Sequence, residues 1–375
     1  MTLRLITDAS DLKGKYVLVR ASCNVPIKDG KVRNAYRLKR ALPTLQYLKE
    51  AGARVIIISH IGRDREDSLR PVFEALKEMI PLAWGGTITD PSFLDARNSM
   101  VNGEIVLCEN LRQDPGEEKN DPALSATIAS YGDLYVNDAF AEAHREHAST
   151  FGVAGLLPAY AGITLAEEVN ELTKVMQPHT PSLFLLGGAK FETKMPLVEK
   201  YLELYDHVFM GGALTNDILK ARGFEVGHSL VSDVSLKDAP FLWSEKLLIP
   251  IDVIVDGPNG VATRAVDAVS PGEKIFDIGP ETVLMLEKYI SAALTILWNG
   301  PFGNYELGYV EGTEAVAELI AEAKGFSVVG GGDTVAAVEK LNLNDKFGFV
   351  SIGGGSMLTL LENGSTPALD LLKKN

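Results

Sequence analysis

The sequence of 375 residues has little that would tie it to a membrane, a disulfide framework or a nucleic acid. It contains only two cysteines, Cys23 and Cys108, and its first residues lack the features of a secretory signal, so we expect a reducing cytoplasm. No apolar run approaches the ~18 residues that a membrane-spanning helix needs. The net charge of −14 argues against nucleic acid as a partner.

Several common ligand-binding motifs are missing as well. The Gly-Lys pairs at Gly14 and Gly30 are not followed by Ser or Thr, so there is no P-loop, and G-x-G-x-x-G does not occur. His144 and His147 form an H-x-x-H, but no carboxylate motif accompanies it, which argues against a metal there. These absences argue against a P-loop protein, a Rossmann dehydrogenase and a structural zinc site.

What remains is an ordinary globular composition, 46% apolar and 23% charged, in a chain long enough for two domains. Buried-strand patterns such as RVIIIS at 54–59 alternate with helical patterns, which predicts an α/β fold of two doubly wound parallel-sheet domains. An amphipathic helix is expected at Leu165–Gln177, before the helix-breaking QPHTP at 177–181. We therefore expect an N-terminal domain of 1–165, with the tail from about 360–375, and a C-terminal domain of 166–359.

The second half shows a repeated pattern in which a short apolar run ends in glycine. The five runs are LFLLGGAK, VFMGGA, ILWNGPFG, FSVVGGGDT and FVSIGGGS. Glycine lets the backbone approach a ligand closely, and a helix that starts after the turn offers free N–H groups to an anion. Five such turns at strand ends predict a phosphate-bearing ligand above a parallel sheet.

Charged side chains accompany these turns and also gather in the first 70 residues. Lys190 and Lys194 are spaced to share one face of a helix, and that face is either solvated or lies beside a polyphosphate. Asp333 could hold a hard cation or cap the N-terminus of a helix. Residues 1–70 have a charge balance of +8, which leaves −22 for the rest. This basic region is either a solvated face or a site for a small anion. Exposed-looking arginines favour the site: Arg20, Arg37, Arg63, Arg112 and Arg145, with Asn24, His60 and His144 nearby in sequence.

Eleven blocks in the same order resemble phosphoglycerate kinase over nearly the whole chain. They are VLVRASCNVP (17–26), NAYRLKRALPT (34–44), SHIGR (59–63), ENLRQDPGEEKND (109–121), VNDAFAEAHREHAST (136–150), LGGAKFETK (186–194), GFEVGHSLV (223–231), DIGPET (277–282), WNGPFGNYE (298–306), GGGDT (330–334) and SIGGGS (351–356). The resemblance implies an N-terminal domain for 3-phosphoglycerate, a C-terminal domain for Mg-ATP or Mg-ADP, and hinge closure for phosphoryl transfer by a cytoplasmic monomer.

The resemblance also implies roles for individual residues. Arg37 and Lys190 would act in the transfer, with the backbone of Gly331 and Gly354 beside the moving phosphoryl group. The triose-phosphate side would be Ser22, Asn24, Arg37, His60, Arg63, Arg112 and Arg145. The nucleotide side would be Gly188, Lys190, Lys194, Gly212, Asn299, Glu306, Gly331, Gly332, Asp333 and Thr334, with Asp333 on the Mg²⁺ side.

The chain departs from the family pattern at several of its blocks. Ser22 stands where the family has an aspartate that contacts the substrate hydroxyl, and Ala141-Glu142 replaces a Gly-Thr. Further departures are Gln113, Asp114, Thr193, Ile352 and the block GGALTNDILK at 211–220. The cationic phosphate contacts all remain, so we expect an active enzyme. The alternatives are a kinase of the same fold for a related phosphorylated acid, and a nucleotide-binding regulator without catalysis.

Overall fold

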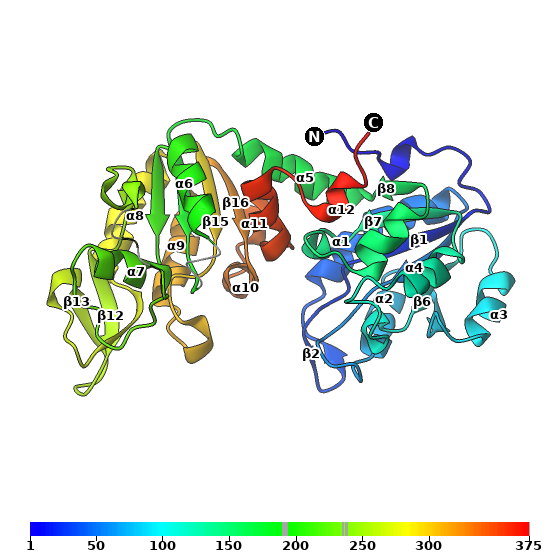
Figure 1. Cartoon of the computed structure of the whole chain (residues 1–375), viewed down its shortest axis with the longest axis horizontal. Helices are drawn as coiled ribbons and strands as arrows, with labels where there is room; N and C mark the ends of the chain where they lie inside the picture. The colour runs from blue at the N-terminus through cyan, green and yellow to red at the C-terminus, as the bar shows by residue number, and fades with distance from the viewer. Residues whose placement is uncertain (190–193, 235, 237–238, 375) are drawn as a thin grey trace. The chain divides into compact units, whose positions relative to one another are not determined.

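The computed structural model describes residues 1–189, 194–234, 236 and 239–374, and these separate into two units. Unit 1 is Met1–Asn170 with the C-terminal segment from Asn363, and unit 2 is Glu171–Glu362. Helix α5 (Ile163–Val175) carries the chain from one unit into the other (Figure 1). The predicted helix at 165–177 is therefore confirmed with a shift of two residues, and the proline-rich segment after it precedes the first strand of unit 2.

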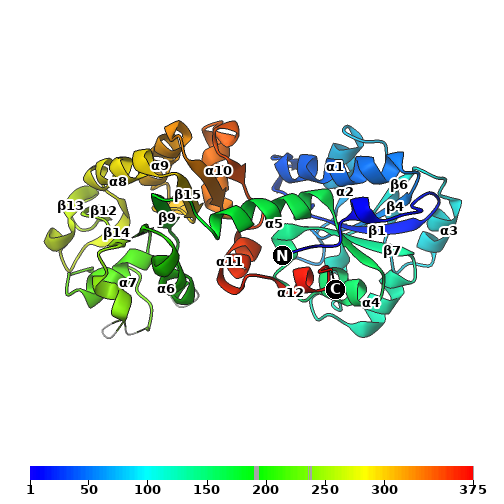
Figure 2. The same cartoon turned by 90° about the horizontal axis from the view of Figure 1, so that it is seen from above.

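Unit 1 is built on a parallel sheet whose strand order is β5-β6-β4-β1-β7-β8. The buried apolar runs form its strands, with helices on both faces, as Figure 2 shows for α1 and α4. The strands are β1 (Tyr16–Ala21), β4 (Arg54–Ile58), β5 (Ala83–Gly86), β6 (Ile105–Cys108), β7 (Leu134–Asp138) and β8 (Ala159–Ala161). The helices are α1 (Tyr36–Glu50), α2 (Arg70–Lys77), α3 (Ser92–Ser99), α4 (Pro122–Ala129) and α12 (Pro367–Asp370), and β2 (Ile27–Lys28) pairs with β3 (Lys31–Val32).

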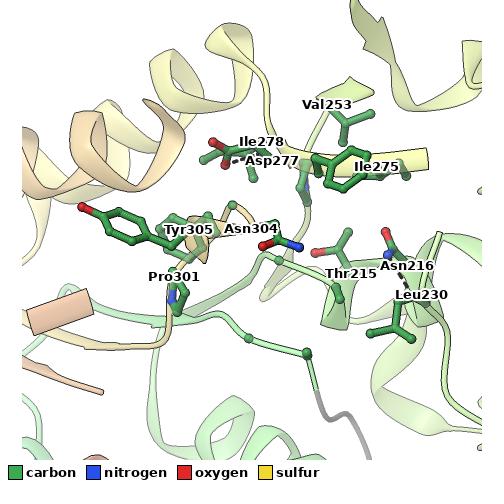
Figure 3. A pocket seen from close by; sticks show the side chains of 18 of the residues that line it. Thr215, Asn216, Leu230, Val253, Ile275, Asp277, Ile278, Pro301, Asn304 and Tyr305 are labelled. Atoms are coloured by element: carbon green, nitrogen blue, oxygen red, sulfur yellow. Dashed lines mark hydrogen bonds between the residues drawn. The ribbon is translucent and has the colours of Figure 1, made fainter. Parts of the chain in front are cut away.

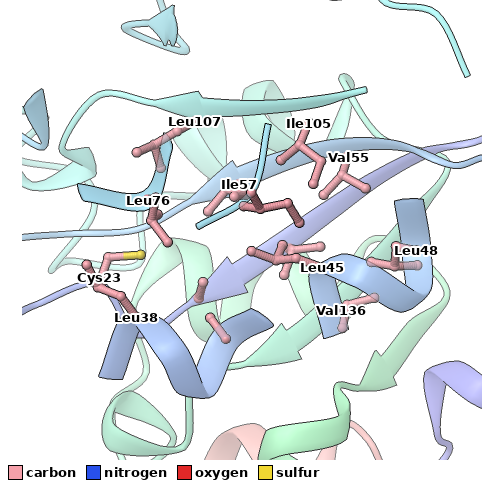
Figure 4. Close-up of a cluster of buried hydrophobic side chains, with 14 of the residues drawn as sticks. Cys23, Leu38, Leu45, Leu48, Val55, Ile57, Leu76, Ile105, Leu107 and Val136 are labelled. Carbon is pink, nitrogen blue, oxygen red and sulfur yellow. The ribbon is translucent and has the colours of Figure 1, made fainter. Parts of the chain in front are cut away.

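The core between α1 and this sheet follows directly from the sequence pattern. Leu38, Leu45 and Leu48 lie on one face of α1 and are fully buried against branched side chains of β4 and β6 (Figure 4). Burial of a leucine side chain contributes about 1.5–3 kcal/mol, so this helix is held mainly by packing. The packing also fixes where α1 begins, at Tyr36, and hence the position of Arg37 in its first turn.

Unit 2 repeats the architecture with strand order β11-β10-β9-β15-β16-β17, all parallel. In Figure 2 helices α8, α9 and α10 lie on one side of the sheet and α6, α7 and α11 on the other. The strands are β9 (Ser182–Leu186), β10 (His207–Met210), β11 (Leu247–Leu248), β15 (Thr295–Asn299), β16 (Phe326–Gly330) and β17 (Phe349–Val350). The helices are α6 (Met195–Leu204), α7 (Leu214–Ala221), α8 (Pro280–Ala292), α9 (Glu311–Glu322), α10 (Gly332–Lys340) and α11 (Gly354–Asn363).

The two parallel sheets confirm the predicted α/β class. The structure adds an antiparallel sheet in unit 2 that the sequence did not predict, formed by β12 (Asp252–Asp256), β13 (Ala262–Ala265) and β14 (Lys274–Ile278) in the order β13-β12-β14. The structure also corrects the expected helix through Lys194, because α6 begins only at Met195.

Candidate functional site

The five predicted glycine turns follow β9, β10, β15, β16 and β17, which are neighbours in the sheet of unit 2. Because the strands are parallel, all five turns lie at the same, carboxyl edge. A pocket of about 360 Å³ opens at this edge, and we call it the glycine pocket (Figure 3). Four of the predicted nucleotide-side residues line it: Gly188, Gly212, Glu306 and Asp333.

The other predicted residues of this group that the structure describes do not line the pocket, and most of them belong to the neighbouring turns. Asn299 ends β15, and a Cβ on Gly354 would lie 2.9 Å from the Cα of Gly331, so these two glycine turns are in close contact. Gly331 has a φ of +102°, which side-chain-bearing residues rarely adopt. It precedes α10, whose first residues are Gly332, Asp333 and Thr334.

The start of α10 combines a free carboxylate with a buried hydroxyl. Asp333 is exposed, whereas the Thr334 side chain is fully buried and none of the described residues pairs with its hydroxyl. The N-terminal end of a helix carries a partial positive charge that favours phosphate oxygens. The structure therefore offers an anion-binding helix end with one carboxylate beside it.

Lys194 is partly buried next to the first glycine turn. Its Nζ donates a hydrogen bond to the Gly187 carbonyl oxygen at 2.5 Å, and a Cβ on Gly188 would lie 2.6 Å from Nζ. Burial lowers the pKa of Lys194 to about 8, since the charged ammonium is poorly solvated there. Lys190, the other predicted lysine, lies outside the described residues.

Two residues of the glycine pocket were missed by the sequence reasoning. The first is Asp277, in the DIGPET block, whose carboxylate accepts hydrogen bonds from the backbone N–H groups of Ile278 and Gly312. Burial raises its pKa to about 7. Asn216 lies on α7 and also lines the pocket. The irregular GGALTNDILK block was the only sequence signal for Asn216, and it marked a departure without indicating a role.

Unit 1 contains a second pocket, of about 750 Å³, which we call the arginine pocket. Its lining residues are Asn24, Gly62, Arg63, Arg112, Glu118, Arg145 and His147. Four of the predicted triose-phosphate residues, Asn24, Arg63, Arg112 and Arg145, therefore come together from four separate blocks of the sequence. Three guanidinium groups around one space favour an anion with more than one negative charge.

Two contacts of Asn24 connect this pocket to α1. The Asn24 carbonyl oxygen accepts a hydrogen bond from Arg37 Nη1 at 2.8 Å, and its Oδ1 accepts one from the Gly62 backbone at 3.1 Å. Arg37 is half-buried and does not itself line the arginine pocket. Asn24 thus ties the first turn of α1 to the loop after β4.

The expectation that the arginines are exposed is wrong for Arg20 and Arg112. Arg20 is fully buried in β1 and donates to Ser149 Oγ (2.9 Å), to the Ala21 carbonyl oxygen (2.6 Å) and to His60 Nδ1 (2.8 Å). Because a guanidinium only donates, Nδ1 of His60 is the acceptor and its ring proton is on Nε2. Burial, then the neighbouring Arg20, lowers the pKa of His60 far below its usual range, so this predicted residue is neutral.

Ser22, in the place of the family aspartate, contacts another departure from the family pattern. Its Oγ donates a hydrogen bond to Glu142 Oε2 at 2.7 Å, and both side chains are buried. The register of the sheet explains the contact, since Ala21 lies opposite Asp138 in the paired strands β1 and β7. A carboxylate is therefore present beside position 22, but it comes from a residue 120 positions away in the sequence.

The described residues contain no group of three or more His, Cys, Asp or Glu side chains that could hold a metal ion by themselves. Among those same residues, no helix is long and apolar enough to cross a membrane. Any cation at the glycine pocket would thus need oxygens of a ligand in addition to carboxylates of the lining such as Asp333.

Unit 1 carries a cationic pocket, and unit 2 carries a glycine-lined pocket at the carboxyl edge of a parallel sheet. The two together are typical of an α/β enzyme that acts on phosphate-bearing small molecules.

Comparison with known proteins identifies the family. The model of the phosphoglycerate kinase family matches residues 6–364. A phosphoglycerate kinase of Rubrobacter xylanophilus is 43% identical over 378 residues, 96% of each chain, and one of Thermus thermophilus is 43% identical over 97% of this chain and 98% of its own. The solved phosphoglycerate kinase of Coxiella burnetii superimposes with a TM-score of 0.83 at 37% identity, covering 99% of this chain and 98% of its own. The chain belongs to the phosphoglycerate kinase family, which are phosphotransferases with a nucleotide substrate.

Proposed function

We propose that this protein transfers a phosphoryl group reversibly between ATP and the carboxylate of 3-phosphoglycerate, giving ADP and 1,3-bisphosphoglycerate. The observation that carries the proposal is the presence of both pockets in one chain of this family. The arginine pocket suits a substrate with a phosphate and a carboxylate, and the glycine pocket suits a nucleotide.

The chemistry needs positioning and charge neutralisation more than proton transfer. A carboxylate oxygen of the substrate attacks the terminal phosphorus, a new P–O bond forms, and the bond to the bridging oxygen of ADP breaks. The attacking oxygen is already ionised, so no general base is required. We assign charge stabilisation to Arg37 and Lys190, the phosphate contacts to Lys194 and the backbone of Gly331 and Gly354, and the ribose contact to Glu306.

We further propose Mg²⁺ as the metal that accompanies the nucleotide. Mg²⁺ is usually bound by one or two carboxylates together with substrate phosphates, and Asp333 is an exposed carboxylate at the glycine pocket that fits this role. When bound, the ion would neutralise phosphate charge. We also propose a monomeric enzyme in the cytoplasm, which agrees with the two buried cysteines, Cys23 and Cys108, being unpaired thiols.

The decisive experiment is an assay of the purified chain with ATP, Mg²⁺ and 3-phosphoglycerate, coupled to consumption of the acyl phosphate. We expect turnover that a Lys190→Ala variant does not show. If the wild-type chain is no faster than this variant, the proposal is wrong.

The Ser22–Glu142 pair supports one second candidate, a kinase of the same fold for a related phosphorylated acid, because it changes the groups around the substrate hydroxyl. A panel of small phosphorylated acids in the same assay separates the two. A better substrate than 3-phosphoglycerate in that panel would favour the second candidate.

Nucleotide binding should depend on pH through Lys194. In the free protein its pKa is about 8, and a bound phosphate should raise that pKa, because the charged form gains a partner. The affinity for ADP should therefore be constant below pH 8. Above pH 8 it should fall by up to about tenfold per pH unit, until the pKa of the complex is reached.

Calorimetry between pH 7 and 9.5 measures this dependence. A Lys194→Arg variant is the control, since arginine stays charged over the whole range and should give a flat profile. Equal slopes for the wild type and the variant would show that another group is responsible.

A further inference from the structure

Asn216 is the one side chain of the glycine pocket that has both complete burial and an unused polar atom among the described residues. It is 1% exposed, and its Oδ1 accepts no hydrogen bond from any described residue. A buried carbonyl oxygen without a donor is unfavourable by about 1–3 kcal/mol relative to a paired one. An atom of this kind beside a ligand pocket indicates that a ligand supplies the missing donor.

The orientation of the amide is fixed by its other contact. The Asn216 Nδ2 lies 2.9 Å from the Leu230 carbonyl oxygen, which can only accept a hydrogen bond. The atom facing Leu230 must therefore be the nitrogen, and the remaining amide atom must be the oxygen. Figure 3 shows the oxygen on the side of the amide away from Leu230. The unpaired atom of this pocket-lining residue is thus an acceptor and not a donor.

Apolar side chains near Asn216 could contact the faces of a flat ring such as a nucleotide base. Val253, Ile275 and Ile278 line the pocket together with Asn216, whereas Glu306 and Asp333 supply the carboxylates that suit the ribose and a metal. Bases need apolar contact on their faces and hydrogen bonds at their edges. Thr215, Lys274 and Asp277 line the same pocket, so the lining is mixed rather than apolar throughout. The Asn216 acceptor can pair with only one kind of edge, one that carries an N–H donor.

We propose that Asn216 is a base-specificity residue, whose Oδ1 accepts a hydrogen bond from the exocyclic amine of adenine. This inference rests on the proposed function, because it takes the glycine pocket as the nucleotide site. A purine without the amine leaves the oxygen unpaired, and hypoxanthine presents a carbonyl oxygen at the same position.

The test is calorimetric binding of ADP, of the diphosphate of purine riboside, which lacks only the amine, and of 2′-deoxy-ADP. The wild-type chain should bind ADP about tenfold more tightly than the amine-free analogue. Asn216→Leu, which keeps the volume and removes the acceptor, should bring this ratio close to one. Asn216→Ala is the second variant and should do the same if the leucine does not fit.

Leu230→Ala is the matched control. It removes an apolar side chain that lines the same pocket but keeps the carbonyl that holds the amide, so it should weaken both ligands equally and leave the ratio near ten. The inference is overturned if the wild type binds the two purines equally or if the ratio persists in both Asn216 variants. It is also overturned if those variants lose only the preference for ADP over 2′-deoxy-ADP, since the acceptor would then serve the ribose. If no adenine nucleotide binds the wild type, the proposed function fails and this inference fails with it.

Discussion

Replacing Ser22 with aspartate, the residue of the family pattern, should lower activity rather than raise it. Glu142 already places a carboxylate 2.7 Å from the Ser22 hydroxyl. Two like charges about 4 Å apart repel by about 4 kcal/mol at the effective dielectric of a protein surface. The new pair would have to share a proton or separate, and unit 1, which carries the arginine pocket, would gain a buried negative charge that opposes an anionic substrate. We expect kcat/KM for 3-phosphoglycerate to fall by roughly a hundredfold.

The double variant Ser22→Asp/Glu142→Thr should recover most of this loss, because it restores the family pair at both positions. Glu142→Thr alone should be weaker than the double variant, since it leaves no carboxylate at this place. The four rates form a double-mutant cycle, and we expect the two positions to be coupled by more than about 1 kcal/mol. Additive effects would mean that Glu142 does not compensate for Ser22.

A matched control exists in the same unit. Ser68 Oγ donates to Glu109 Oε2 at 2.7 Å, which reproduces the serine–glutamate pair at a partly buried place outside the predicted substrate residues. Ser68→Asp should cost stability through the same repulsion but should leave the KM for 3-phosphoglycerate unchanged. An equal loss of substrate affinity in this control would show that the Ser22 effect is a general consequence of an added charge.

The sequence predicted the sheets well because their strands are continuous apolar runs, and it predicted the nucleotide edge because glycines follow those runs. It did not predict which cations face a pocket. Arg20 and Arg63 both follow apolar segments, yet Arg20 is fully buried within β1 and Arg63 is exposed. That difference depends on the side chains that surround each position in three dimensions.

The Ser22–Glu142 contact could not be predicted from the sequence for a related reason. The two positions could be recognised as departures from the family pattern, but their proximity depends on the pairing of β1 with β7. Along the chain, three other strands of this sheet lie between β1 and β7. The same holds for Asn216, whose unpaired oxygen becomes visible only when the Leu230 carbonyl is placed beside its amide nitrogen. Patterns along the chain identify elements and turns, whereas the partners of buried polar atoms come from the topology.

Removal of Arg20 should destabilise unit 1 strongly. Arg20 Nε donates to Ser149 Oγ, and Ser149 in turn donates from its backbone and hydroxyl to the buried Glu117. Burial raises the pKa of Glu117, and the charge of Arg20 partly opposes this rise, so the guanidinium favours the ionised form of the carboxylate. Arg20→Met takes away the cation and leaves a buried charge uncompensated, which typically costs about 3–5 kcal/mol. Urea unfolding followed at Trp84, the tryptophan of unit 1, in a background without Trp243 and Trp298, measures the loss.

The pH dependence distinguishes this mechanism from simple loss of packing. Without Arg20, the folded-state pKa of Glu117 should rise further above its unfolded value. A carboxyl group with a raised folded pKa favours the folded state at low pH and loses that contribution as the pH rises through the folded pKa. The loss of unfolding free energy in Arg20→Met relative to wild type should therefore be smaller at pH 5 than at pH 8. Adding Glu117→Gln to the Arg20→Met variant should reduce that loss at pH 8. Arg33→Met, which breaks the exposed ion pair with Asp29, should cost less than about 1 kcal/mol at either pH. A deficit for Arg20→Met that does not change with pH would assign the effect to lost hydrogen bonds and packing alone.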